Sequence, residues 1–158
     1  EELFAGRARI YKYYFVAQPV PHAALLAADP KASIQFRQLG ANEAKALARP
    51  PEVIEDRLAQ GAICIAGFKN AELAGFIWLL CGSYREDEVR CRFTPRPQAD
   101  AAWDFDVYVA PRFRLGRFFV RLGEQAHDYL RARSIRWTIS RISACNSASV
   151  STVQFTVQ

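Results

Sequence analysis

The sequence is poor in the residues that build metal and redox sites. It contains two histidines, His22 and His127, and four cysteines, none of which forms a Cys-x-x-Cys pair. A structural zinc site takes four such ligands at close spacing, so we expect no metal site. The widely spaced cysteines instead suggest free thiols in a reducing cytoplasm.

Long apolar segments are also lacking. The longest apolar run, residues 76–81, has the length of a strand and is too short to cross a bilayer. At 158 residues, with 51% hydrophobic and 13% aromatic residues, the chain has enough apolar material for the core of one domain. We therefore expect a single cytoplasmic domain over residues 1–158, without a membrane segment or a signal peptide.

The charge of the chain is compatible with two kinds of anionic partner. The formal net charge is +5, the isoelectric point is near 9.2, and basic residues concentrate after Arg112. A local anion-binding site explains this concentration as well as a nucleic-acid-binding face does. Charge alone therefore does not decide between them.

The clearest local pattern is a strand, a turn and a helix over residues 103–133. Residues 103–109 alternate between apolar and polar side chains, which predicts a strand. Pro111 ends this strand, because proline cannot donate to a ladder. Apolar residues then recur at helical spacing from Phe118 to Leu130. The free N–H groups at this helix N-terminus predict a phosphate or pyrophosphate site, which is flanked by Arg112, Arg114 and Arg117.

The remaining segments predict a mixed α/β domain. Helices are expected over 42–48 and 52–60, with a short one capped by Asn146. The short link between the apolar segments 62–68 and 72–81 predicts an antiparallel hairpin. The helix that follows residues 103–109 predicts that this strand is parallel to 135–142, because parallel strands need a crossover connection. Further strands are expected over 9–16, 34–39, 88–93 and 153–158.

Two segments resemble the GNAT superfamily of acyl-CoA-dependent N-acyltransferases. They are residues 104–117 (DFDVYVAPRFRLGR) and 140–149 (SRISACNSAS), within a likeness that runs from about Ile34 to Ser151. The resemblance implies a central, mostly antiparallel mixed sheet with one parallel, splayed strand pair, flanked by helices. In that family the first segment is a strand and its pyrophosphate loop, and the second is the next parallel strand. The acyl-pantetheine arm lies between the two.

The resemblance also implies which residues bind acetyl-CoA or another acyl-CoA. The backbone of Val107 and Val109 would contact the pantetheine arm. Asn146 and Ser149 would lie beside the same arm. The pyrophosphate would be surrounded by the backbone N–H groups of Arg114, Leu115, Gly116, Arg117, Phe118 and Phe119.

Amine acylation needs a base for the ammonium group, a donor that polarises the acyl carbonyl, and an acid for the leaving thiolate. Regular alternation places Asp104, Asp106 and Tyr108 on the same side of their strand. In the family a carboxylate on this strand often acts as the base, so both aspartates are candidates and Tyr108 is a candidate proton donor. The alternative is that the aspartates are solvated and Tyr108 is a structural aromatic.

Candidate contacts to the acceptor come from two other segments. Tyr84, Glu86 and Asp87 form an acidic turn that would favour a cationic amine, although a charged surface turn has the same composition. Arg141 lies near the end of the strand 135–142, where ligand crevices open in such sheets, and would bind an acceptor carboxylate. The partner is thus a small-molecule or peptide amine, and the sequence permits a homodimer.

We therefore predict an N-acyltransferase that moves an acetyl or other short acyl group from coenzyme A to an amine. Direct attack in a ternary complex is favoured, because no cysteine lies beside a histidine. A non-catalytic module with this fold is an alternative, supported by the single displaced Gly116 and by Val153, where many relatives carry a tyrosine acid. A basic RNA-binding domain ranks lower, because the aromatics fall on the apolar face of the predicted helix.

Overall fold

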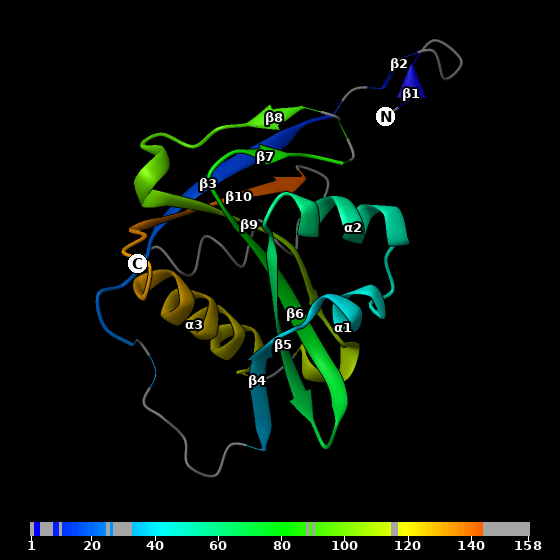
Figure 1. Cartoon of the computed structure of the whole chain (residues 1–158), viewed down its shortest axis with the longest axis vertical. Helices are drawn as coiled ribbons and strands as arrows, with labels where there is room; N and C mark the ends of the chain where they lie inside the picture. The colour runs from blue at the N-terminus through cyan, green and yellow to red at the C-terminus, as the bar shows by residue number, and fades with distance from the viewer. Residues whose placement is uncertain are drawn as a thin grey trace.

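The computed structural model describes residues 2–3, 8–9, 11–24, 26, 33–87, 89, 91–114 and 117–143. Its centre is a six-stranded sheet in the order β3-β10-β9-β6-β5-β4 (Figure 1). Neighbouring strands are antiparallel except β9 and β10, which are parallel, so the predicted fold class is confirmed. These strands are β3 (Tyr13–Pro19), β4 (Ile34–Gln38), β5 (Ile63–Lys69), β6 (Glu72–Cys81), β9 (Ala101–Val109) and β10 (Trp137–Ser143).

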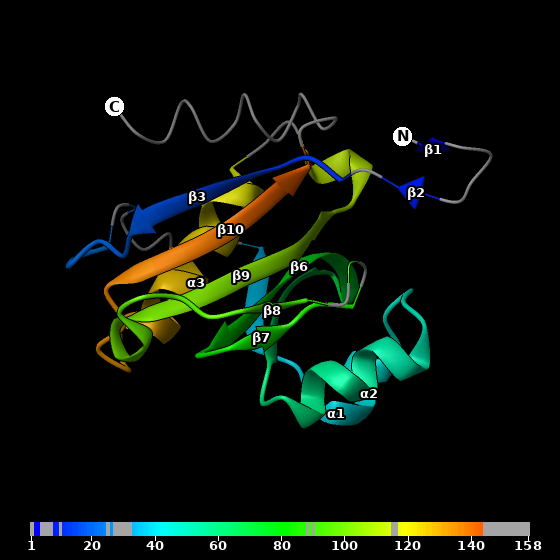
Figure 2. The ribbon, with the colours of Figure 1, turned by 90° about the horizontal axis from the view of Figure 1, so that it is seen from above.

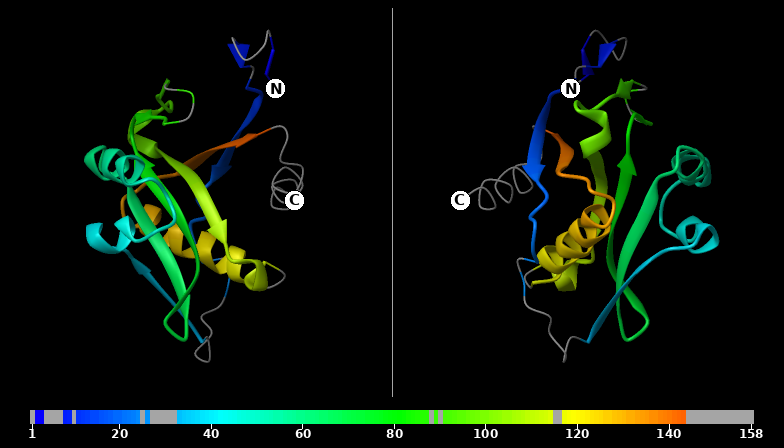
Figure 3. Two further views of the ribbon diagram at one scale, coloured as in Figure 1. Left: turned by 90° about the vertical axis from the view of Figure 1, so that its right-hand side faces the viewer. Right: turned by 60° about the vertical axis from the view of Figure 1, so that its left-hand side comes forward.

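Helices cover both faces of this sheet. Figure 3 shows α3 (Phe118–Arg131) on one face and α1 (Ala41–Lys45) and α2 (Pro51–Ala59) on the other. Among the helices that the structure describes, none has the length and apolar character needed to cross a bilayer. The short elements are β1 (Glu2–Leu3), β2 (Ala8–Arg9), β7 (Tyr84–Arg85), β8 (Arg92–Phe93) and the 3-10 turns η1 (Gln98–Asp100) and η2 (Pro111–Phe113).

Local sequence signals explain most of the element boundaries. β5 and β6 form the predicted hairpin, whose turn residues Asn70 and Ala71 both have positive φ. Pro51 occupies the first turn of α2, where its missing N–H is not needed. The helix predicted from Asn42 begins earlier, with Gly40 as its N-cap, because the Glu43 carboxylate accepts a hydrogen bond from Gly40 N at 3.0 Å.

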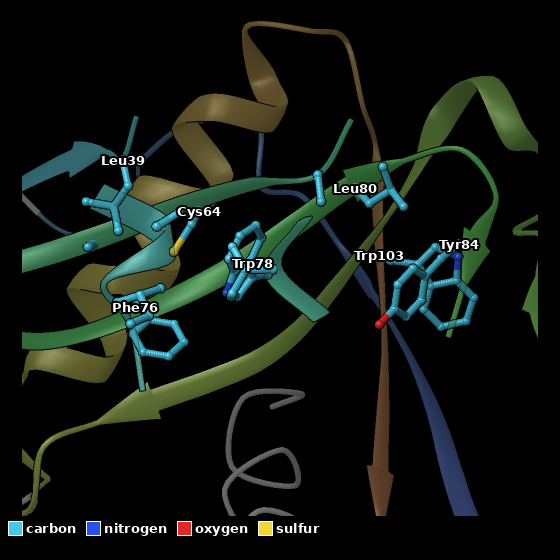
Figure 4. Close-up of a cluster of buried hydrophobic side chains, with 12 residues drawn as sticks. Leu39, Cys64, Phe76, Trp78, Leu80, Tyr84 and Trp103 are labelled. Atoms are coloured by element: carbon cyan, nitrogen blue, oxygen red, sulfur yellow. The ribbon is translucent and has the colours of Figure 1, made fainter. Parts of the chain in front are cut away.

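The core between the sheet and the α1/α2 layer is built around two tryptophans. Trp78 on β6 is completely buried and Trp103 on β9 is 4% exposed (Figure 4). β6 is buried along residues 74–80 because helices cover both of its faces, which explains its nearly continuous apolar sequence. This core therefore fixes the middle of β9 against α2.

The core under α3 depends on a close approach at the helix N-terminus. Phe118 is 3% exposed, and its ring lies against Gly67 on β5 and Gly75 on β6. A Cβ atom on Gly67 would lie 2.7 Å from this ring, and one on Gly75 would lie 2.6 Å from it and collide with the Tyr108 carbonyl oxygen. The two glycines thus provide the space in which Phe118 anchors the first turn of α3.

The N-terminal strand takes a place that the sequence did not predict. The strand expected over 9–16 begins at Tyr13, and β3 pairs antiparallel with β10 along its whole length (Figure 2). The far side of β10 is therefore occupied by a segment that precedes the rest of the sheet in sequence. The predicted strand over 153–158 and the helix capped by Asn146 lie outside the described residues.

We expect Gly75→Ala to lower the free energy of unfolding by about 2 kcal/mol, because the added methyl group displaces Phe118 or the backbone of β9. Gly123→Ala is the matched control, since among the described residues no atom outside the adjoining residues and the helix's own backbone lies within 4 Å of a Cβ built at that position. It should raise stability by about 0.5–1 kcal/mol through helix propensity alone. Urea denaturation of both variants measures the difference, and equal stabilities would contradict the close contact.

Candidate functional site

The two parallel strands separate after a short stretch of pairing. β9 and β10 pair over four rungs, from Ala101 with Trp137 to Asp104 with Ser140. Beyond this last rung β9 continues to Val109 and β10 to Ser143, but the described residues 105–109 and 141–143 do not pair with each other. The splayed pair that the resemblance implied is therefore present, with Asp104 and Ser140 where it begins to open.

The N-terminus of α3 follows the open end of β9 in the chain, after the turn η2. No side chain among the described residues caps this helix, and its first turn contains no acidic residue. Arg117 is exposed at the N-cap, and Arg114 donates from Nε to the Val109 carbonyl oxygen at 3.0 Å. The first-turn N–H groups and these arginines are suited to an anion.

The other residues predicted for this loop are placed differently. Arg112 forms an ion pair with Glu72 on β6. The side chain of Phe118 belongs to the core, whereas Phe119 is 43% exposed. Leu115 and Gly116 lie outside the described residues, as do Asn146 and Ser149.

Asp104 lies at the last rung of the parallel pair and is partly buried. The Ser140 hydroxyl donates a hydrogen bond of 2.5 Å to its Oδ1 atom, and Thr138 also hydrogen-bonds to the carboxylate. Burial raises the pKa of Asp104 above its ordinary value, although these hydrogen bonds oppose the rise. His127 on α3 lies close enough for its charge to affect the same pKa. Asp104 is thus a carboxylate that gains a proton more readily than usual.

Asp106 faces the opposite side of the sheet, toward α2. Its carboxylate accepts hydrogen bonds from Arg49 Nε at 2.9 Å, Arg49 Nη2 at 2.5 Å and Arg57 Nη1 at 2.5 Å. Burial alone would raise the pKa of Asp106, but the two guanidinium groups outweigh it and hold the pKa below its ordinary value. Asp106 is therefore a paired, ionised carboxylate.

A β-bulge explains why these two aspartates diverge. Phe105 pairs with Trp78 and Tyr108 pairs with Phe76, so two residues of β9 lie opposite the single Ile77. Asp106 has a φ of 47° at this point. The bulge turns Asp106 and Tyr108 toward the α1/α2 layer, where Tyr108 packs against Phe76. The expectation that Asp104, Asp106 and Tyr108 share one side is therefore wrong.

Arginines of the protein itself pair with carboxylates of the acidic turn. The Tyr84 hydroxyl donates to Asp87 Oδ1 at 3.1 Å, and Arg57 Nη2 donates to Asp87 Oδ2 at 3.3 Å. Glu86, 5% exposed, accepts a hydrogen bond of 2.7 Å from Arg141. Burial is the main cause that raises the pKa of the Tyr84 hydroxyl. Arg57 thus joins Tyr84 and Asp87 to Asp106 in one network.

Sequence reasoning missed the two arginines that organise this network. Arg49 and Arg57 precede Asp106 by 57 and 49 residues, so no local spacing connects them to the strand. Arg57 is 6% exposed, which its position on a charged helix does not suggest. Among the described residues no group of three or more His, Cys, Asp or Glu side chains is arranged to hold a metal ion.

The paired state of Asp106 predicts a pH-dependent contribution to stability. Because the folded pKa of Asp106 lies below the ordinary value of an aspartate, the contribution is fully present above that ordinary value and is lost as pH falls through the folded pKa. We expect Asp106→Asn to lower the free energy of unfolding by about 2–3 kcal/mol at pH 7. Parallel urea titrations at pH 7 and pH 3 should show a smaller difference from the wild type at pH 3; a constant difference would contradict the ion pairs.

Comparison with known proteins supports the fold. No protein-family model and no curated protein sequence matches this chain. It is similar to a predicted acetyltransferase from Clostridium acetobutylicum crystallised with acetyl-CoA, at 9% identity over 76% of this chain and 88% of that one, with a TM-score of 0.53. An aminoglycoside acetyltransferase from an uncultured soil metagenomic sample, in complex with sisomicin, matches at 10% identity over 80% and 88%, with a TM-score of 0.56.

A third similar structure names the superfamily. It is a protein from Novosphingobium aromaticivorans assigned to the GNAT family, which matches at 14% identity over 92% of this chain and 59% of that one, with a TM-score of 0.55. The mixed sheet of this chain, with one parallel pair and helices on both faces, is consistent with that fold. The chain therefore has the fold of the GNAT acetyltransferases.

Proposed function

We propose that this protein is an N-acyltransferase that moves an acetyl or other short acyl group from coenzyme A to an amine, by direct attack in a ternary complex. One observation carries the proposal. The parallel strands β9 and β10 separate beyond Asp104 and Ser140, and the N-terminus of α3, which no described side chain caps, follows the open end of β9. The gap between the two separating strands, which we call the slot, could take an extended pantetheine arm. The N-terminus of α3 would serve as the anion site, or phosphate seat, for the phosphates of the same donor.

The donor would lie along β9 with its phosphates at α3. The backbone of Val107 and Val109 would contact the pantetheine arm, and Val107 is 40% exposed. The pyrophosphate would be held by N–H groups in the first turn of α3 and by the guanidinium groups of Arg114 and Arg117. Asn146 and Ser149 remain predicted contacts to the arm.

Asp104 is our candidate for the general base. It lies where the slot begins to open, and its raised pKa suits a group that must accept a proton from the amine. As the amine nitrogen bonds to the acyl carbon, its proton passes to the carboxylate and the thiolate of coenzyme A leaves. Tyr108, partly buried beside Phe76, is the candidate that returns a proton to the thiolate.

The charges on the α2 side favour an acceptor of low charge. Asp106, Asp87 and Glu86 are each hydrogen-bonded to at least one arginine, so a polycation finds these three carboxylates already paired. We infer a small amine or a peptide amine, whose nitrogen would approach Asp104 where β9 and β10 separate. A cationic acceptor selected by the acidic turn would first have to displace Arg57 or Arg141.

The first test is isothermal titration of the protein with acetyl-CoA, with free ATP and desulfo-CoA as controls. We expect micromolar binding of acetyl-CoA, much weaker binding of ATP, and about a tenfold loss of acetyl-CoA affinity in Arg114→Glu. Arg92→Glu is the charge-matched control, because β8 packs on the opposite face of the sheet from α3. An affinity of Arg114→Glu equal to that of Arg92→Glu would contradict the phosphate seat, and binding without turnover of any amine would support a non-catalytic module.

The variant Asp104→Asn tests whether Asp104 acts as the general base. Removal of a general base lowers kcat by about a hundredfold or more, while acetyl-CoA affinity should change little. In the wild type kcat should fall as pH drops through the raised pKa of Asp104, because the protonated carboxyl cannot accept a proton. The assay should use a weakly basic acceptor amine, so that ionisation of the amine does not mask this fall in kcat. If kcat of Asp104→Asn still falls at low pH, the general base is a different residue.

A further inference from the structure

The bulge in β9 requires a backbone conformation that its own sequence does not favour. Asp106 has a φ of 47°, whereas strand residues adopt strongly negative φ values. Glycine adopts positive φ freely, and aspartate tolerates it better than most residues but does not prefer it. The side chain at this position must therefore be held by other parts of the molecule.

Arg49 and Arg57 supply that hold from outside the sheet. Arg49 follows α1 and makes a two-pronged contact with both oxygens of Asp106, at 2.9 and 2.5 Å. Arg57 on α2 reaches Oδ2 at 2.5 Å. A two-pronged guanidinium contact fixes the direction of a carboxylate as well as its distance. We call Arg49, Asp106 and Arg57 the bulge clamp.

The clamp is itself fixed by the core. Arg57 is 6% exposed, and its guanidinium lies 5.4 Å from the ring centre of Trp78 and 5.3 Å from that of Phe105. The second nitrogen of the same group donates to Asp87. Buried ion pairs often stabilise a fold no more than apolar residues of the same size would, so we assign this one to fixing a single conformation.

The bulge lies between the last parallel rung and the end of β9 that precedes α3. Asp106 and Val107 both face Ile77, so one of these residues has backbone groups without a regular partner on β6. The same stretch of β9 has no pairing to the described part of β10. A backbone donor at this point is positioned to contact the arm of an acyl donor.

We propose that Arg49 and Arg57 are positioning residues, which hold the Asp106 side chain on the α2 side and thereby fix the bulge that presents the Val107 backbone to the acyl-pantetheine arm. This inference rests on the proposed function. It gives the two aspartates of β9 separate roles, since Asp104 accepts the proton and Asp106 sets the shape of the strand. Neither arginine contacts the reacting atoms.

The test compares Asp106→Ala with Asp106→Gly. Alanine disfavours positive φ, so the bulge should relax and the pairing of β9 with β6 should shift, whereas glycine permits the conformation without a clamp. We expect kcat to fall by about a hundredfold in the alanine variant, as for other small misplacements of reacting groups, and to recover substantially in the glycine variant. Arg49→Lys keeps the charge but loses the two-pronged contact. Its kcat should lie between those of the alanine and glycine variants, and the pH dependence of its kcat should be unchanged.

Arg37→Lys is the matched control, because Arg37 forms an exposed ion pair with Glu43 on the surface. NMR contacts between Trp78 and Phe105 and between Phe76 and Tyr108 report the register directly and need no activity. An unchanged register in both Asp106→Ala and Arg49→Lys would overturn the proposal. So would a glycine variant no more active than the alanine variant, or loss of the low-pH fall of kcat in Asp106→Asn.

The two proposals fail in different ways. A folded wild-type protein that binds no acetyl-CoA contradicts the proposed function and the catalytic part of this inference. The register measurement still decides, in that same protein, whether the clamp sets the bulge. Arg49 is 31% exposed in its side chain, so Arg49→Lys should fold even if the alanine variant does not.

Discussion

The contact of Phe118 with two glycines determines where the candidate site is built. Its ring enters the space left by Gly67 and Gly75, and this places the first turn of α3 against the middle of the sheet. Because α3 is the next helix after β9 and only the turn η2 stands between them in the element order, the open end of the strand and the helix N-terminus are held near each other. This contact therefore sets the position of the proposed anion site relative to the open end of β9.

The crossover through α3 provides the second condition for the site. It makes β9 and β10 parallel, and their pairing lasts for four rungs before the strands separate. On the other side β9 stays paired with β6, and β10 stays paired with β3. Each strand is thus held by its outer neighbour while the two inner edges diverge.

Three carboxylates of the candidate site have different environments, although the sequence offered Asp104 and Asp106 alike as candidate bases. Asp104 is partly buried beside Ser140 and keeps a raised pKa, whereas Asp106 is held ionised by two arginines. Asp87 receives hydrogen bonds from Arg57 and Tyr84. Only the first has the character expected of a proton acceptor, since the others are paired with cations.

The sequence by itself determined the elements whose signals are local. The hairpin of β5 and β6, the start of α2 at Pro51, and the order of strand, turn and helix around Pro111 all follow from spacing and backbone preferences. Only the tertiary structure decided that Asp106 turns away from Asp104, that Arg49 and Arg57 meet it, and that β3 lies beside β10. These features join residues dozens of positions apart, and a single extra residue in β9 changes which face a side chain occupies, so no local pattern could reveal them.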